Sequence, residues 1–159
     1  MLQNNLIDAI SSGFHGKWTH LEPKKALAGL TPATAKKKPN NVDYSCWELL
    51  YHIVFWQETI IKQIKGETLD WDELEKKGNW PSEQSMQDDS NFHKLQTRFH
   101  SGIEEAQNLL AKTDFTKIAT GWPELSVIKL FLVFLQHTSY HLGQIVAIRK
   151  CLSNWPEGQ

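Results

Sequence analysis

Two histidines four residues apart are the first feature of this sequence that could do chemistry. His137 and His141 lie in the segment FLQHTSYHLGQI (residues 134–145), whose remaining pattern is that of a buried helix. Residues i and i+4 of a helix share one face and lie about 6 Å apart along the axis, so both imidazoles can point at one place. A buried imidazole without a partner costs on the order of 1–3 kcal/mol. A shared metal ion meets this need better than two separate hydrogen bonds, but a metal site requires a third ligand.

A third imidazole is expected on an earlier helix. Ser45 and Glu48 have the spacing of a capping box, so they predict a helix that begins after Ser45. Apolar residues then recur at helical spacing to about Lys65, and Gly66 ends the helix. His52 falls on the apolar face of this segment and is therefore the candidate third ligand.

Four segments with helical periodicity must position these side chains. They cover residues 2–12, 45–65, 85–112 and 124–152. Residues 17–44 are predicted as a loop with one helical turn near 24–28, residues 66–80 as a polar connection anchored by Trp71 and Trp80, and residues 113–123 as a loop. No strand-like alternation is present. The sequence therefore predicts an all-α protein, a four-helix bundle with a long crossover after the first helix, in a single domain over residues 1–159.

Metal sites in helical bundles are built from side chains that point inward from facing helices, and His52, His137 and His141 fit this arrangement. Three imidazoles leave coordination positions open, as catalytic sites do, whereas structural sites are closed by protein ligands. Beside them, Gly143 is expected to allow close helix packing, and Gln144 to hydrogen-bond a ligand, a water or another helix. Two alternatives stay open: a non-catalytic metal-binding protein acting in stress response or interaction, and a bundle whose histidines only pair in the core.

The other histidines and Cys46 are not expected to bind the same ion. His93 and His100 lie about 10.5 Å apart along one helix axis, too far to share a metal whose bonds are about 2.1 Å long. His15 and His20 lie in loop-like sequence and are expected at the surface. Cys46 lies on the side of its helix away from the histidine face, so it is not counted as a ligand.

Composition and charge exclude several classes of protein. The chain has 159 residues with 17 basic and 18 acidic side chains, a net charge of −1, so no basic surface for nucleic acid or an anionic membrane is expected. The N-terminus lacks the pattern of a signal peptide, and the longest apolar run is too short to span a bilayer. The two cysteines form no CxxC pattern. These features favour a cytoplasmic protein.

The last predicted helix, residues 124–152, is apolar nearly all round, so one bundle is not expected to cover every side of it. A second apolar line runs beside the histidine face. Its members are Ile128, Leu132, Leu135, Leu142 and Val146. We therefore expect a homodimer that forms through this helix and a neighbouring one.

Two segments resemble the DinB-like superfamily: WELLYHIVFWQ (residues 47–57) and, about 80 residues later, HTSYHLGQI (residues 137–145). The family's pattern is one histidine on the second helix and HxxxHxGQ on the last. The resemblance covers nearly the whole chain and implies that His52, His137 and His141 bind a divalent metal, commonly nickel or zinc. It also implies an up-down-down-up bundle that is often dimeric. Tyr140 stands where many relatives have another histidine, a departure that removes no ligand.

The same resemblance suggests a reaction class. The family includes S-transferases that use bacillithiol or mycothiol, a mycothiol-dependent isomerase, and many members without a known activity. What it implies here is a metal-dependent enzyme of thiol S-transferase-like or hydrolase-like type, with a low-molecular-weight thiol as the candidate second cofactor. Bound to such an ion, a water or thiol would have a lowered pKa. The residues themselves identify no substrate.

Overall fold

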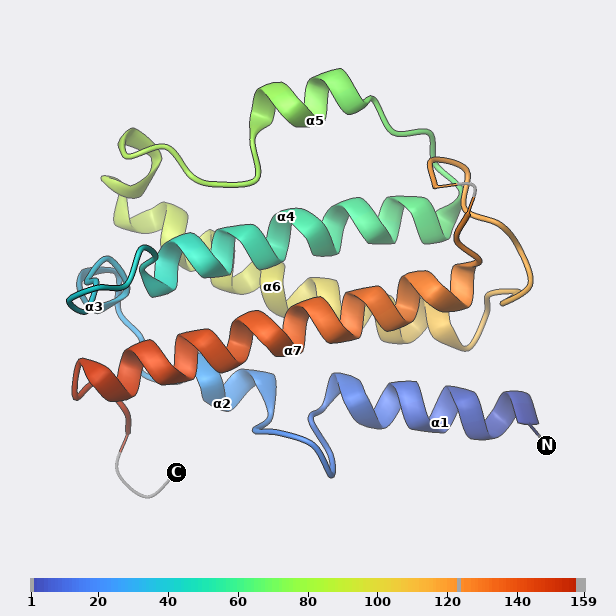
Figure 1. Ribbon diagram of the computed structural model, residues 1–159, viewed down its shortest axis with the longest axis horizontal. Helices are drawn as coiled ribbons and strands as arrows, with labels where there is room; N and C mark the ends of the chain where they lie inside the picture. Colours follow the sequence, from blue (N-terminus) through green and yellow to red (C-terminus); the bar gives the residue numbers. More distant parts are fainter. Residues whose placement is uncertain (1, 123, 157–159) are drawn as a thin grey trace.

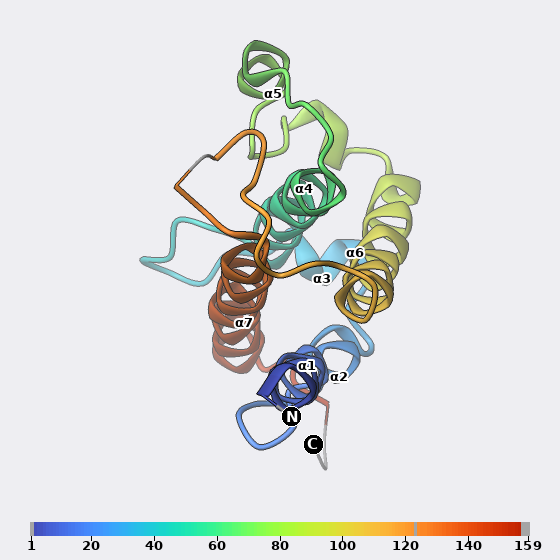
Figure 2. The same ribbon diagram turned by 90° about the vertical axis from the view of Figure 1, so that its right-hand side faces the viewer.

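Four long helices lie side by side, as the apolar periodicity predicts (Figure 1). The computed structural model describes residues 2–122 and 124–156. The long helices are α1 (Leu2–Phe14), α4 (Cys46–Lys65), α6 (Asp89–Leu110) and α7 (Val127–Cys151). Seen end-on, they surround a common centre (Figure 2). Helices α1 and α7 run in one direction and α4 and α6 in the other (Figure 1). In the described part of the chain, all regular structure is helical apart from one isolated bridge between Ile118 and Ser126.

Short helices occupy connections that the sequence predicted as mostly irregular. They are α2 (Pro23–Leu27), α3 (Pro32–Ala35), α5 (Trp71–Lys77) and the 3-10 helix η1 (Gln84–Met86). Both α2 and α3 begin at a proline, whose fixed φ suits the first helical position. Helix α5 buries no side chain fully and lies outside the bundle beside α4 (Figure 2). Helix α2 confirms the helical turn that was predicted near residues 24–28. The apolar periodicity could not reveal the other three helices, because each is too short to show a repeating face.

A capping box determines where α4 begins, whereas Ser126 at the start of α7 makes no side-chain capping hydrogen bond. At α4 the predicted capping box is confirmed: the Ser45 hydroxyl accepts from the Glu48 amide, and the Glu48 carboxylate accepts from the Ser45 amide at 2.7 Å. Gly66 ends α4 in the left-handed conformation, with φ of 81°. Helix α7 begins at Val127, after Ser126 at the N-cap position, and not at residue 124 as predicted.

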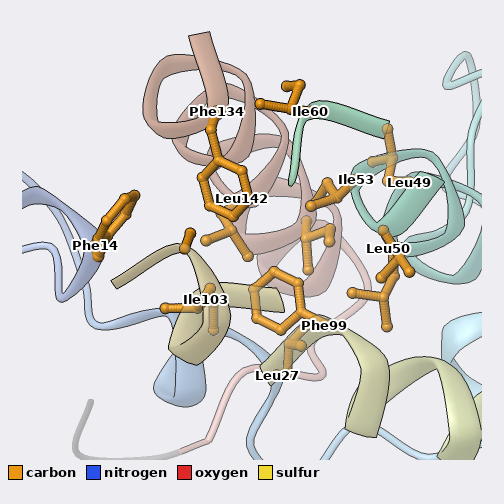
Figure 3. Packing of buried hydrophobic residues seen from close by; sticks show 14 of the residues in the cluster. Phe14, Leu27, Leu49, Leu50, Ile53, Ile60, Phe99, Ile103, Phe134 and Leu142 are labelled. Carbon is orange, nitrogen blue, oxygen red and sulfur yellow. The ribbon is translucent and has the colours of Figure 1, made fainter. Parts of the chain in front are cut away.

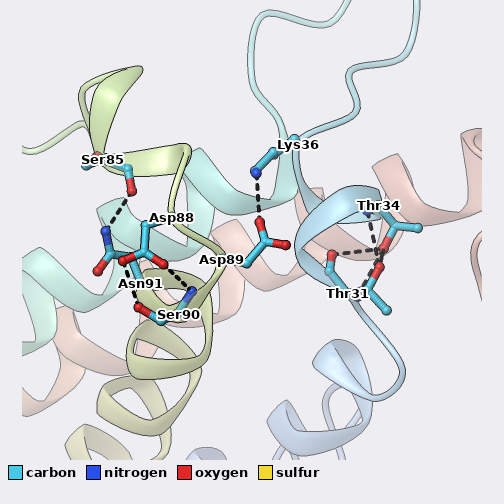
Figure 4. A network of polar contacts seen from close by, with 8 residues as sticks. All are labelled: Thr31, Thr34, Lys36, Ser85, Asp88, Asp89, Ser90 and Asn91. Carbon is cyan, nitrogen blue, oxygen red and sulfur yellow. Dashed lines mark hydrogen bonds and ion pairs between the residues drawn. The ribbon is translucent and has the colours of Figure 1, made fainter.

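Helix α6 also begins later than predicted, at Asp89 instead of residue 85. Asp88 is the N-cap, and its carboxylate accepts hydrogen bonds from the amide and the hydroxyl of Ser90, both at 2.9 Å (Figure 4). Asp89 forms an ion pair with Lys36, which follows α3, at 2.9 Å. This exposed ion pair joins the crossover segment to the start of α6.

The core lies between α4, α6 and α7, and α1 closes its open side (Figures 2 and 3). Helix α4 packs most extensively, against α7 on one side and α6 on the other. Among the buried residues drawn in Figure 3 are Phe14, Leu27, Leu49, Leu50, Ile53, Ile60, Phe99, Ile103, Phe134 and Leu142. This packing fixes α4 against α7, the two helices that carry the three candidate histidines.

A buried arginine attaches the end of α7 to the crossover segment. Arg149 is only 1 % exposed, and its guanidinium donates to the carbonyls of Ala26, Ala28 and Asn154 at 2.6, 2.7 and 3.1 Å. Burial lowers its pKa, yet the three carbonyls supply the partners that a buried cation needs. The role of Arg149 is therefore structural.

The second apolar line of α7 is less open than the sequence suggested. Leu142 is buried, and the other members apart from Leu132 are half-buried against the core. A Cβ atom at Gly13 of α1 would lie only 2.6 Å from the Leu135 side chain, so α1 packs closely on this face. Gly143 was expected to allow close helix packing, but apart from its own stretch of helix, no atom of the described residues lies within 4 Å of where its Cβ would be. Within the described residues, no helix has both the length and the apolar character needed to cross a bilayer.

Candidate metal centre

Helices α4 and α7 bring His52, His137 and His141 into one cluster. The Nε2 atoms of His52 and His137 are 3.2 Å apart, and one nitrogen from each of the three rings lies within 4.8 Å of the others. Two nitrogens bound tetrahedrally to zinc at about 2.0–2.1 Å are about 3.3 Å apart. The Nε2 atoms of His52 and His137 already have this spacing, while the two ring nitrogens that lie farthest apart would have to move slightly closer together. The residues therefore fit a shared divalent ion.

The ring of His52 is held by the connection that follows α5. Its Nδ1–H donates to the Asn79 carbonyl at 3.1 Å, so in the neutral tautomer the lone pair is on Nε2. Trp80 stacks on the imidazole with centroids 4.3 Å apart, and Tyr44 stacks on Trp80 at 4.4 Å. The sequence identified Trp80 only as an anchor. It held no signal for Asn79, because a backbone carbonyl has no side-chain signature.

A glutamine one turn further along α7 orients His141. The Gln144 side-chain carbonyl accepts from His141 Nδ1–H at 2.6 Å, and its amide donates to the Tyr140 hydroxyl at 3.5 Å. As in His52, Nδ1 carries the proton, and the lone pair of Nε2 is left free to bind a metal ion. Such partners of metal-binding imidazoles fix the tautomer and the ring orientation. Gln144 thus contacts the candidate ligand His141 of its own helix and not the neighbouring helix.

Electrostatics keep all three rings neutral near neutral pH. Burial, together with the smaller effects of His141 and His52 nearby, lowers the pKa of His137 to about 4. Burial also lowers the pKa of His52, against the opposing hydrogen bond to Asn79, and that of His141, against the opposing hydrogen bond to Gln144. Because metals bind the deprotonated nitrogen, this environment prepares the rings for an ion.

The remaining histidines lie apart from this cluster, as the sequence predicted. His20 was expected at the surface, but it is half-buried and bonds the Ser139 hydroxyl at 2.8 Å. His15 bonds Gln107 at 3.1 Å. His93 is exposed, while His100 is half-buried with its Nδ1 atom unpaired among the described residues.

Cys46 is a core residue and not a candidate ligand. Its thiol donates to the Ile145 carbonyl at 3.8 Å, and burial raises its pKa to about 12. A thiol that stays protonated binds metals poorly, because the thiolate is the ligand form. In the described chain, His52, His137 and His141 form the one group of three or more His, Cys, Asp or Glu residues arranged to hold an ion.

The orienting role of Gln144 can be measured. We expect Gln144→Leu to weaken metal affinity about 10- to 100-fold, because His141 loses the acceptor that fixes its tautomer. Competition with a chromogenic chelator measures the affinity. Gln136→Leu, on the exposed side of the same helix, is the matched control and should bind as the wild type does. Equal affinity in both variants would show that Gln144 does not orient the ligand.

Comparison with known families agrees with this geometry. The family described as the DinB superfamily matches residues 22–145, a stretch that begins just before α2, contains all three histidines and ends within α7. No curated protein and no solved structure matches the chain. The family match thus includes both helices that form the site, while α1 lies before the matched residues.

Proposed function

Because this chain belongs to the DinB superfamily, we propose that it is a metal-dependent enzyme whose divalent ion is held by His52, His137 and His141. The observation that carries the proposal is the convergence of three neutral imidazoles from two helices. Among the described residues, no fourth His, Cys, Asp or Glu completes the group. Protein ligands close a structural zinc site, whereas a site with three ligands leaves room for a substrate or a thiol.

Nickel and zinc are the proposed ions, since imidazole suits both. When bound, such an ion supplies Lewis acidity to a thiol or to a hydrolysable group, which supports thiol S-transferase-like or hydrolase-like chemistry. The chain itself supplies orientation and desolvation. Asn79 and Gln144 hold two of the rings, and Trp80 covers one face of His52.

The test is turnover of two model reactions by the zinc- and nickel-loaded protein. One joins a low-molecular-weight thiol to 1-chloro-2,4-dinitrobenzene, and the other hydrolyses 4-nitrophenyl acetate. We expect one reaction to be lost on chelation and restored by the ion, and the reaction that responds distinguishes transferase from hydrolase. His141→Ala is the inactive control. A protein that binds the ion stoichiometrically but accelerates neither reaction would instead be a non-catalytic metal-binding protein.

We also propose that the chain is a single up-down-down-up bundle that forms a homodimer in the cytoplasm. The opposite directions of the helix pairs support the topology (Figure 1). Both cysteines are free thiols, which suits a reducing compartment. Leu132 and Tyr140 are exposed on α7, with exposed fractions of 38 % and 65 %, and Gly143 on the same side leaves room for a close helix contact.

The dimer is tested by light scattering at tens of micromolar protein. We expect a mass of twice 18.3 kDa for the wild type and the single-chain mass for Leu132→Glu, which places a charge in the proposed contact. Gln107→Glu, on α6, is the control and should leave the mass unchanged. A wild type with the single-chain mass would contradict the dimer.

A further inference from the structure

An apolar cavity of about 260 Å³ lies beside the histidine cluster. It lies between α4, α7 and the chain that precedes α7, and it is partly open to solvent. The described residues that line it are Trp56, Ile60, Trp122, Leu125, Val133 and His137. These six include no lysine, arginine, aspartate or glutamate. Because His137 belongs to both the cavity and the cluster, a group held in the cavity lies next to the candidate ion.

Two tryptophan rings form one wall of this cavity, and they belong to a row of aromatic contacts that begins at the histidines. Trp56 makes edge contacts with His52 and His137, at centroid distances of 6.4 and 6.3 Å. Trp122 lies nearly parallel to Trp56, at 6.4 Å and an interplanar angle of 27°, and Trp71 contacts Trp122 at 5.3 Å. Indole faces are large, rigid and apolar, and they suit flat ligands better than flexible polar ones.

We infer that this cavity binds a neutral, flat, apolar group of the substrate, such as one substituted ring or two fused rings, with the reacting end at the three histidines. This inference rests on the proposed enzymatic function and specifies its substrate class. A cavity of roughly 150 Å³ in another protein holds benzene, so about 260 Å³ admits a larger flat group. A charged group is disfavoured, because burial without a charged partner is costly.

Two neighbouring residues of α7 allow a matched test. Val133 and Leu132 are each 38 % exposed, but only Val133 lines the cavity. Val133→Trp should fill the space, whereas Leu132→Trp adds the same side chain outside it. Since both positions are partly exposed, neither replacement has to enter the core. Circular dichroism establishes that the two variants share one fold. Because Leu132 also lies in the proposed dimer contact, binding is compared at a protein concentration at which light scattering gives both variants and the wild type the same mass.

The probe is 5-fluoroindole, with binding followed by fluorine NMR on metal-free and zinc-loaded protein. We expect Val133→Trp to weaken the binding of 5-fluoroindole at least about tenfold, because most of one ring of the probe can then no longer be buried in the cavity. Leu132→Trp should bind the probe as the wild type does. On metal-free protein, 5-fluoroindole-2-carboxylate should bind at least about tenfold more weakly than 5-fluoroindole, because its charge finds no partner.

The possible results separate this inference from the proposed function. Equal binding to both tryptophan variants, or tighter binding of the carboxylate to metal-free protein, would overturn the inference even if the enzyme is active. Binding of 5-fluoroindole that Val133→Trp abolishes and Leu132→Trp retains supports the apolar subsite. That result would stand even if neither model reaction were accelerated, in which case the proposed enzymatic function alone would fail.

Discussion

Replacing His137 by alanine is expected to leave the purified protein without its metal. Wild type prepared without chelators should carry about one divalent ion per chain, since the three rings form one site. Loss of even an orienting partner costs about 10- to 100-fold in affinity, so loss of a ligand should cost more than roughly 100-fold. Elemental analysis by mass spectrometry measures the content. His52→Ala and His141→Ala should show the same loss.

The matched control is His93→Ala on α6, which removes an exposed histidine outside the cluster. It should keep the full metal content and any metal-dependent turnover. Full occupancy in the alanine variant of His52, His137 or His141 would remove that residue from the ligand set. Loss of metal in all three variants, together with retention in the control, would establish that one ion joins α4 to α7.

The second large effect is on stability, and it depends on pH. With free metal at about 100 times its dissociation constant, the ion should add about 2.7 kcal/mol to the free energy of unfolding. For a chain of this size, that raises the melting temperature by roughly 5–10 °C at neutral pH. Differential scanning calorimetry of metal-loaded and metal-free protein measures the gap. His52→Ala should show little gap at any pH, because this variant is expected to lose the ion.

The gap should close as the pH falls. In the folded protein without metal, burial lowers the pKa of His52, His137 and His141, that of His137 to about 4, from an unfolded value near 6.5. Between these values the unfolded chain binds more protons, so the metal-free protein itself becomes less stable with falling pH. The ion is displaced only when the folded rings bind protons, so the gap closes as the pH falls through their lowered folded pKa values, of which that of His137 is about 4. Equal melting temperatures at neutral pH with metal bound would contradict the three-histidine site.

The sequence by itself determined the four long helices and the faces on which the three histidines lie. Helical periodicity and the capping box at Ser45 are local properties, so they predict α4 nearly to the residue. The spacing of His137 and His141 is likewise a property of one helix. The family motif joined His52 to that pair before any contact was known, and the structure places all three in one cluster.

Only the tertiary structure decided what surrounds the histidines. The carbonyl of Asn79 and the ring of Trp80 reach His52 from a connection whose path depends on packing between distant segments. The same is true of the apolar cavity, which exists only because Trp56 of α4, Trp122 and Val133 of α7 come to lie around one space. Such contacts join residues far apart in the chain, and no local pattern encodes the distance between them. Local sequence preferences therefore decide which helix faces carry the three histidines, and the packing of α4 against α7 brings these faces together into one candidate site.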